Sequence, residues 1–490
     1  MSSRLESSAG WNLQNTYAQL PSVLHAEIEP TPVRAPRVVV LNRPLAEQLG
    51  LSPDALTGDE GAALLAGNRP PPGSTPLAQA YAGHQYGHFT TLGDGRAILL
   101  GEQVTPQGGR FDVQLKGSGP TQFSRRGDGR AALGPMLREY LISEAMHALG
   151  IPTTRSLAVT ATGETVFRQE RLPGAVLTRV AASHIRVGTF EWAAAQGDDT
   201  ALRALVDYTV KRHYPELAGD ENPALALLNA VIERQASLIA QWMLVGFVHG
   251  VMNTDNMALS GETIDYGPCA FIDAYNPAKV FSSIDRHGRY AYGNQPTIAQ
   301  WNLTRLAESL LPLLHVEEAP AIALAESALA RFGDRFQHHW LAGMRRKLGL
   351  FNAEDGDVAL FKTLLTRLHA TKADYTNTFA MLTSDALPAE AVLASDAAFV
   401  SWHADWQARL DRQPQSRADS LQLRRSSNPA FIPRNHLVEA ALAAGQQGDL
   451  APFERLLDVL ATPYDHNRMA PDYRLPAPDA GVGYQTFCGT

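Results

Sequence analysis

The chain has 490 residues, of which 45% are hydrophobic and 19% are charged. This balance is typical of a folded globular protein and excludes a chain that is disordered throughout. Lysine and arginine number 42 and aspartate and glutamate 50, which gives a formal net charge of −8. Sequence-independent nucleic-acid binding requires a basic surface, so this acidic chain is a poor candidate for it and we expect no nucleic-acid partner.

Cysteine content and hydropathy narrow the class of protein further. Only two cysteines occur, Cys269 and Cys488, which excludes a secreted domain built on disulfides. The N-terminal residues contain no apolar signal core. The most apolar stretch, residues 237–252, is interrupted by Gln241 and His249 and is shorter than the ~20 residues that cross a bilayer. We therefore expect a soluble, cytoplasmic protein with no membrane partner.

The first 175 residues predict a small lobe that is rich in β-strands. Residues 1–80 contain many prolines and turn residues, and short apolar runs separated by glycines follow them. An extended connector is predicted at residues 69–76, and two antiparallel strands at 96–104 and 110–117. One helix is predicted at 133–150, and a second hairpin at 153–171 with its turn at Thr162-Gly163.

Beyond residue 175 the apolar residues recur with helical spacing, and a larger helical lobe is predicted. The periodic segments are 199–213, 223–249, 297–314, 319–348, 357–370 and 436–460. The fold class predicted from the sequence is therefore α+β, with a β-rich lobe, one helix inside it, and a helical lobe.

A glycine-rich turn precedes the first predicted strand of the pair. Gly93 and Gly95 would allow backbone N–H groups to approach a phosphate closely, and Arg96 adds a positive charge. Taken alone, this pattern indicates a plain turn as readily as a phosphate site. Lys116, at the end of the next strand, is either a solvated strand lysine or a phosphate-binding lysine held by a carboxylate.

Two carboxylates on the predicted helix at 133–150 could hold Lys116. Glu144 lies near the centre of the apolar stripe, whereas Glu139 lies off it. An unpaired buried glutamate is costly, so Glu144 needs a partner or a cavity. The helical pattern alone therefore slightly favours Glu144.

Two further groups could bind an anion. Asp128-Gly129 lies just before the same helix, in a loop that is either an anion or ribose site or an ordinary surface loop. Arg179 and Arg186 are seven residues apart, so on a helix they would share one face. A structural salt-bridge role is an equally plausible interpretation of these arginines.

Residues 247–274 carry the most informative pattern. An apolar helix is expected to end at His249-Gly250, after which Asn256 and Asp265 supply oxygen ligands suited to Mg²⁺. The spacing resembles the protein-kinase arrangement of catalytic loop and metal-binding aspartate. The usual base position falls on Val251, which cannot accept a proton, and Asp255 is the substitute.

A histidine pair is a weaker candidate for a metal site. His84 and His88 have a spacing of four residues, as zinc ligands on a helix do. No glutamate lies between them in the usual pattern and no third ligand is evident. We expect a structural role.

Taken together, these motifs resemble the selenoprotein O family, also called the YdiU family. The resemblance covers most of the chain, and the ending FCGT fits it as well. The segments that carry it are YAGHQYGHFTTLGDGRA (81–97), DVQLKGSGPTQFSRRGDGRA (112–131), LREYLISEAMHALGIPTTRSLA (137–158), HGVMNTDNMALSGETIDYGPCAFID (249–273) and NPAFIPRNH (428–436).

The resemblance implies a protein-kinase-like bilobal fold whose reaction is transfer of AMP from ATP to Ser, Thr or Tyr hydroxyls of proteins. Mg²⁺ or Mn²⁺ is the implied metal, UTP with Mn²⁺ is a second candidate donor, and redox proteins are among the candidate acceptors. The implied nucleotide-binding residues are Gly93, Gly95, Arg96, Lys116, Asp128, Gly129, Arg179, Arg186 and Asp265. Asp255 would be the general base, Asn256 and Asp265 would bind the metal, and Glu139 would pair with Lys116.

The resemblance also implies an organisation and a mode of regulation. The expected parts are an N-terminal extension (1–80), an N-lobe (81–174), a helical C-lobe (175–400) and a C-terminal extension (401–490). A Cys269–Cys488 disulfide would tether the tail over the active site, whereas the alternative is two unpaired thiols. Two other functions stay open at this stage: a conventional kinase, and a nucleotide-binding pseudoenzyme that acts as an interaction module.

Overall fold

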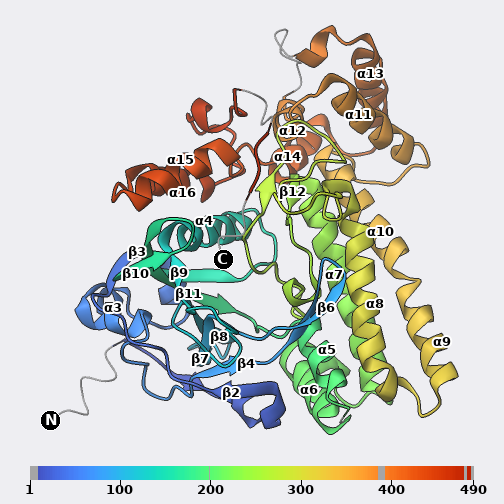
Figure 1. Ribbon diagram of the computed structural model, residues 1–490. Coiled ribbons are helices and arrows are strands. Elements are labelled where there is room, and N and C mark those ends of the chain that lie inside the picture. Colours follow the sequence, from blue (N-terminus) through green and yellow to red (C-terminus); the bar gives the residue numbers. More distant parts are fainter. Residues whose placement is uncertain (1–8, 198, 385–391, 479–482, 487–490) are drawn as a thin grey trace.

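The computed structural model describes residues 9–197, 199–384, 392–478 and 483–486. Within these ranges the chain combines a large antiparallel sheet with many helices (Figure 1). The sheet lies on one side of the molecule, and the long helices α7 (Pro223–Val245), α8 (Gln295–Leu314) and α10 (Phe332–Lys347) lie on the other. The predicted α+β class is confirmed at this level of description.

The large sheet contains nine strands in the described residues, and every pairing in it is antiparallel. Four of these strands come from residues 1–80, the expected N-terminal extension. The strand order is β2 (His25–Glu27), β4 (Leu77–Gln79), β7 (Ala97–Val104), β8 (Arg110–Lys116), β11 (Arg171–Ala181), β10 (Arg155–Phe167) and β3 (Arg37–Leu41), with β1 (Leu13–Gln14) on β7 and β9 (Ala131–Ala132) on β11.

The two predicted hairpins have different outcomes. The hairpin of β7 and β8 is confirmed, and its register places Lys116 opposite Ala97. The second hairpin was placed wrongly, because β10 and β11 turn at residues 168–170 instead of at Thr162-Gly163. Gly163 has a φ of +70° and lies where the register shifts, so it serves a bulge inside the long strand. Strand β11 also continues past residue 174, the expected end of the N-lobe.

A separate hairpin, β5 (Ala82–Gln85) with β6 (His88–Thr91), leaves the sheet and lies against the helices (Figure 1). Its turn residues Tyr86 and Gly87 both have positive φ, +51° and +90°, as a tight two-residue hairpin turn requires. β5 packs against α5 (Val187–Ala195) and the short 3₁₀ helix η4 (Thr254–Asn256). His84 and His88 therefore lie on a hairpin and not on a helix.

The predicted helical segments are present, with three changes at their ends and interiors. Residues 319–348 form two helices, and so do residues 436–460. Helix α7 ends at Val245, before the expected His249-Gly250, because Gly246 adopts a left-handed conformation with φ +75°. The remaining helices are α1 (Arg43–Gln48), α2 (Pro53–Thr57), α3 (Asp59–Leu65), α4 (Leu133–Ala148), α6 (Asp199–His213), α9 (Glu318–Leu329), α11 (Asp357–Thr371), α12 (Tyr375–Met381), α13 (Ala397–Asp411), α14 (Arg417–Ser427), α15 (Asn435–Gln446) and α16 (Ala451–Leu460).

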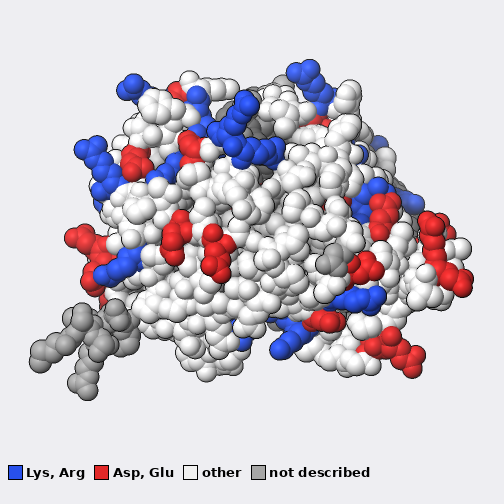
Figure 2. Space-filling view, turned by 60° about the horizontal axis from the view of Figure 1, so that its bottom comes forward, with Lys and Arg blue, Asp and Glu red and all other residues white. Residues whose placement is uncertain are grey.

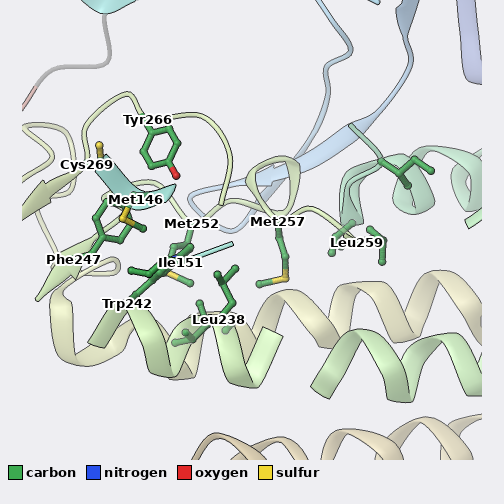
Figure 3. Close-up of a cluster of buried hydrophobic side chains, with 14 of the residues drawn as sticks. Met146, Ile151, Leu238, Trp242, Phe247, Met252, Met257, Leu259, Tyr266 and Cys269 are labelled. Atoms are coloured by element: carbon green, nitrogen blue, oxygen red, sulfur yellow. The ribbon is translucent and has the colours of Figure 1, made fainter. Parts of the chain in front are cut away.

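The main hydrophobic core joins the sheet side to the helical side and holds the loop of residues 251–257 (Figure 3). Met252 and Met257 flank this loop, and both are buried in the cluster that contains Leu238 and Trp242 of α7. Burial of large apolar side chains on both sides of a loop fixes its path, since each contributes about 1.5–3 kcal/mol. The core thus anchors both ends of the loop that carries Asp255 and Asn256.

The exposed charges are mixed in sign on the face shown in Figure 2, and a broad part of that face carries none. Such a face presents no extended region of one charge. Among the described helices, none combines the length and the apolar character that crossing a membrane requires.

Candidate active site

A cavity of about 910 Å³ lies between the sheet and the helices. This volume is in the range of small-molecule and cofactor sites. Residues from the sheet, from helix α4 and from the loops of the helical part line it together. The candidate residues among its lining are Gly95, Arg96, Lys116, Glu139, Arg179, Arg186, Asp255, Asn256 and Asp265.

Lys116, the last residue of β8, is buried and forms ion pairs with two carboxylates. Its Nζ donates to Glu139 Oε2 at 2.6 Å and to Asp265 Oδ1 at 2.7 Å. Glu144 instead accepts from Arg155 at 2.6 Å, so the helical-wheel preference for Glu144 was wrong. The reason is that α4 is covered by the sheet on one side and by α15 and α16 on another, so it has no single apolar stripe.

Arg179 and Arg186 reach the same point by a route that the sequence did not predict. Arg179 lies in strand β11, and Arg186 precedes α5 as its N-cap residue, so they do not share a helix face. Arg179 Nη1 donates to Asp265 Oδ1 at 2.7 Å and to Glu139 at 3.1 Å. Arg186 Nη1 lies 3.5 Å from Asp265 Oδ2. The strand and the loop after it therefore aim both guanidinium groups at one carboxylate.

Asp265 is the centre of this group of charges. Its backbone has a φ of +61°, a conformation that aspartate tolerates better than most side chains do. Burial would raise the pKa of its carboxyl, but Lys116, Arg179 and Arg186 outweigh burial and hold that pKa well below its usual range. Asp265 is therefore ionised at every physiological pH.

Asp255 lies on η4, and its pKa is shifted in the opposite direction from that of Asp265. Its side chain is buried, and its Oδ1 has no hydrogen-bond partner among the described residues. Burial raises its pKa to about 7, although Arg186 opposes the shift. A carboxylate with a pKa near neutrality is suited to accept a proton.

The residues around Asp255 fix the loop that carries it. Asn256 Nδ2 donates to the carbonyl of Val251 at 2.9 Å, which orients the amide. His249 hydrogen-bonds through Nε2 to the carbonyl of Ile264 at 2.8 Å. That bond ties the start of the loop to the residue before Asp265.

The oxygen donors in the cavity fit a hard cation that is shared with a bound phosphate. Asp265 and Asn256 supply a carboxylate and an amide, the ligand types that Mg²⁺ accepts alongside phosphate oxygens. The described residues contain no group of three or more His, Cys, Asp or Glu side chains arranged to hold a metal. Asn256 and Asp265 would leave further positions on such a cation for phosphate oxygens or water.

Of the nucleotide-binding residues expected in the glycine turn and in the 117–130 loop, only some line the cavity. Gly95 and Arg96 line the cavity, whereas the ring of Phe123 packs on Gly93, where an added Cβ would lie 2.4 Å from a ring carbon. Asp128 is exposed and forms an ion pair with Arg168 at 2.9 Å, which lowers the pKa of its carboxyl. An added Cβ on Gly129 would lie 2.1 Å from backbone atoms of residue 119. Gly93, Asp128 and Gly129 are thus absent from the cavity lining.

The cysteines are only partly covered by the described residues. Cys269 is buried, and burial raises the pKa of its thiol to about 12. Cys488 lies outside the described residues. Thr486, two residues before it, donates from Oγ1 to the carbonyl of Pro268 at 2.7 Å, and Tyr484 receives a hydrogen bond from Arg138 at 3.2 Å.

Sequence reasoning missed two residues of this site. Asp94 is buried 3.9 Å from Arg186, and it accepts from Gln114 Nε2 at 3.0 Å. Tyr81 stacks under the Arg186 guanidinium, whose central carbon lies 4.5 Å from the ring centre. The position of Asp94 between Gly93 and Gly95 is the sequence signal that could have found it.

Comparison with known proteins identifies the class of protein to which the chain belongs. The family model described as "Protein adenylyltransferase SelO" matches residues 9–461. The chain therefore belongs to this family, and with it to the nucleotidyltransferases.

Curated relatives agree over nearly the whole length. The chain is 61% identical over 482 residues to the protein nucleotidyltransferase YdiU of Bacillus cytotoxicus, with 98% of each chain covered. It is 62% identical over 484 residues to the protein of that name from Halalkalibacterium halodurans, again with 98% of each covered. A solved kinase domain of a Toxoplasma gondii rhoptry antigen matches with 13% identity and covers 59% of this chain and 87% of that one. Its TM-score of 0.25 is too low to support an argument.

Proposed function

We propose that this protein transfers AMP from ATP to Ser, Thr or Tyr hydroxyls of protein acceptors. The observation that carries the proposal is the separation of charge in one cavity. Lys116, Arg179 and Arg186 converge on Asp265, while Asp255 is buried with a pKa of about 7. Cations suit the phosphates of a nucleotide, and a neutral-range carboxylate suits the proton of a hydroxyl.

The chemistry that follows is an in-line displacement at the α-phosphorus. The acceptor oxygen forms a bond to that phosphorus, the bond between the α- and β-phosphates breaks, and pyrophosphate leaves. Lys116, Arg179 and Arg186 neutralise the charge on the phosphates and on the departing pyrophosphate. Asp255 takes the hydroxyl proton, and Glu139 holds Lys116 in position.

Asn256 and Asp265 would hold the divalent cation of this reaction, Mg²⁺ or Mn²⁺, which supplies further neutralisation of phosphate charge. UTP with Mn²⁺ is a second candidate donor under this proposal. The nucleotide-binding set that we propose keeps all the expected residues. Contact of Gly93, Asp128 and Gly129 with the nucleotide would require residues 117–130 to shift toward the cavity.

The fold that we propose is kinase-like and bilobal. The sheet with α4 would form the N-lobe, with the Lys116–Glu139 pair in the position of the kinase lysine and glutamate. The helices from α5 onward would form the C-lobe, and the last 90 residues, with α15 and α16 packed on α4, would form the extension. We also place the protein in the cytoplasm, which the presence of only two cysteines supports.

We further propose redox control through a Cys269–Cys488 disulfide, with redox proteins among the acceptors. The contact of Thr486 with Pro268 supports the pairing, because Thr486 is two residues before Cys488 in the sequence and Pro268 directly precedes Cys269. Tyr484 and Thr486 line the cavity, so a tethered tail would restrict access to it. Non-reducing peptide mapping of oxidised protein should recover the disulfide; two free thiols would contradict it.

The position of the transferred phosphorus tests the proposed function. ATP labelled at the α- or at the γ-phosphate is incubated with the protein and a cell lysate, with Mg²⁺ and then with Mn²⁺. We expect protein-bound label only from the α position. Label from the γ position would identify a conventional kinase, and no label from either, with ATP binding confirmed, would indicate an interaction module.

A further inference from the structure

The hairpin β5–β6 follows the loop that carries Asp255, residue by residue. Tyr86 N–H donates to Asn253 Oδ1 at 3.1 Å, and His84 N–H donates to Thr254 Oγ1 at 2.7 Å. At Gly83 the approach is closest, because an added Cβ would lie 2.4 Å from Asp255 Oδ1. Successive contacts of this kind align the loop with the hairpin.

Glu191 of α5 connects the hairpin and the loop a second time. The Thr254 hydroxyl donates to Glu191 Oε2 at 2.5 Å, and His84 Nδ1 is hydrogen-bonded to the other oxygen of the same carboxylate. The Thr254 hydroxyl is fully buried, accepting from the hairpin and donating to the helix. A hydroxyl that uses both its donor and acceptor capacity in a buried place has one orientation.

The helical part supports the far side of this arrangement. The His84 ring packs edge-on against Trp301 of α8, with 5.2 Å between ring centres. Tyr290 OH donates to Asn253 Oδ1 at 2.6 Å, beside the bond from Tyr86. An added Cβ on Gly188 would lie 2.0 Å from the Ala82 carbonyl oxygen, so α5 and β5 are in direct contact.

We infer that the hairpin and Glu191 position Asp255 for proton transfer, with the Thr254 hydroxyl as the central link. Gly83 is the point at which the hairpin touches the carboxylate itself. This inference rests on the proposed role of Asp255 as base. His84, Thr254 and Glu191 are positioning residues, since each acts through the loop and not on the reacting atoms.

A merely structural role would lower stability without separating binding from turnover. A positioning role predicts slower transfer at saturating ATP with little change in ATP affinity. Lys116 and Arg179 lie in the sheet, and Arg186 donates to the Asp255 carbonyl at 3.2 Å, so none of the three cations bonds the Thr254 hydroxyl. Displacement of a reacting group by about 1 Å can cost on the order of 10²-fold in rate. The two roles therefore differ in a measurable way.

The test compares Thr254→Val, which removes the hydroxyl at nearly constant shape, with Thr254→Ser, which keeps it. Gly83→Ala adds the methyl group that meets Asp255, and Gly333→Ala is its control, because nothing lies within 4 Å of an added Cβ there. Three quantities are measured on the full chain: the rate of α-label transfer at saturating ATP, the ATP Kd by calorimetry, and amide hydrogen exchange over residues 250–258.

We expect Thr254→Val and Gly83→Ala to slow transfer by about tenfold or more with ATP Kd within about twofold of wild type. Thr254→Ser should restore most of the rate, and Gly333→Ala should match wild type. Hydrogen exchange over 250–258 should be faster in Thr254→Val and normal in Thr254→Ser. Wild-type transfer in Thr254→Val, or a loss of ATP affinity equal to the loss of rate, would overturn the inference.

The two proposals can fail separately in this experiment. If the wild-type protein transfers no α-label, the proposed function fails. Hydrogen exchange then tests by itself whether the Thr254 hydroxyl fixes the loop that carries Asp255, because exchange does not depend on activity. Equal protection of residues 250–258 in wild type and Thr254→Val would overturn it.

Discussion

Asp255 and Asp265 are the same residue type, ten positions apart, in the same cavity, and their surroundings are opposite. Asp265 is contacted by three cations, which hold its pKa well below the usual range. Asp255 has an oxygen without a hydrogen-bond partner among the described residues, and burial raises its pKa to about 7. The contrast shows that position relative to the sheet, and not residue type, decides which carboxylate anchors charge and which can accept a proton.

The difference arises from the elements that surround each residue. Lys116 and Arg179 lie on neighbouring strands of the sheet, and Asp265 follows a loop that returns to their ends. Asp255 lies between α5 and the β5–β6 hairpin. Gly83 of the hairpin approaches its carboxylate, whereas Arg186, at the start of α5, donates to its backbone carbonyl at 3.2 Å. Four predictions test this contrast, beginning with the largest effect.

Loss of Asp265 should abolish transfer, because Lys116, Arg179 and Arg186 lose their common partner and the proposed cation loses a ligand. Asp265→Ala is measured by α-label transfer. Asp265→Asn is the matched variant, since asparagine also tolerates the backbone φ of +61°. Both variants should be inactive, and wild-type activity in either would remove Asp265 from the site.

Asp255→Asn should lower transfer by about 10²-fold, the usual contribution of a positioned general base. ATP affinity should stay the same, because no phosphate-binding cation is changed. Calorimetry with ATP checks the binding. A variant that transfers at the wild-type rate would show that the reaction needs no base at this position.

Two glutamates of helix α4 provide the third test. Glu139→Gln should lower ATP affinity and transfer by about 10- to 100-fold, since hydrogen bonds to charged groups contribute about 1.5–3 kcal/mol. Glu144→Gln should leave transfer unchanged and lower stability only, because Glu144 bonds Arg155 and the Ser156 backbone. Equal losses of transfer in both variants would contradict the assignment of Lys116 to Glu139.

The fourth effect concerns stability and pH. The folded-state pKa of Asp255 is raised from 3.8 to about 7, so the folded protein binds this proton more tightly and loses stability as pH rises between these values. Asp255→Asn should remove that loss and stabilise the protein at pH 8 by up to about 4 kcal/mol, because a tenfold change in proton affinity corresponds to about 1.4 kcal/mol. Denaturant unfolding at pH 5 and 8 measures it. Equal stability of both proteins at pH 8 would place the pKa of Asp255 near its ordinary value.

Local sequence pattern predicted the local features of this fold and failed at the long-range ones. The strands at 97–104 and 110–116 and the helix at 133–148 follow from turn sequence and apolar spacing. Three of the strands contributed by residues 1–80 have only two or three residues, too few for a periodic pattern, whereas the valine run of β3 (Arg37–Leu41) is a local signal that could have predicted a strand. The turn at 168–170 was missed because Gly163 gives a stronger turn signal and serves a bulge instead.

The same division holds for the candidate site. Lys116, Asp255, Asn256 and Asp265 were found because their spacing matches a known arrangement of chemistry. The choice of Glu139 over Glu144 could not come from helical periodicity, because α4 is buried on most of its surface. The link from His84 through Glu191 to Thr254 joins residues 63 and 107 positions apart in the chain, which only the tertiary structure brings together.

The pH dependence of α-label transfer tests the central contrast most directly. Transfer is measured from pH 5 to 9 at saturating ATP in the wild-type protein and in Asp255→Asn. We predict that the wild-type rate rises through a midpoint of about 7, as Asp255 loses its proton, and that the residual rate of Asp255→Asn lacks this rise. The same rise in both proteins would contradict the assignment of Asp255 as the proton acceptor.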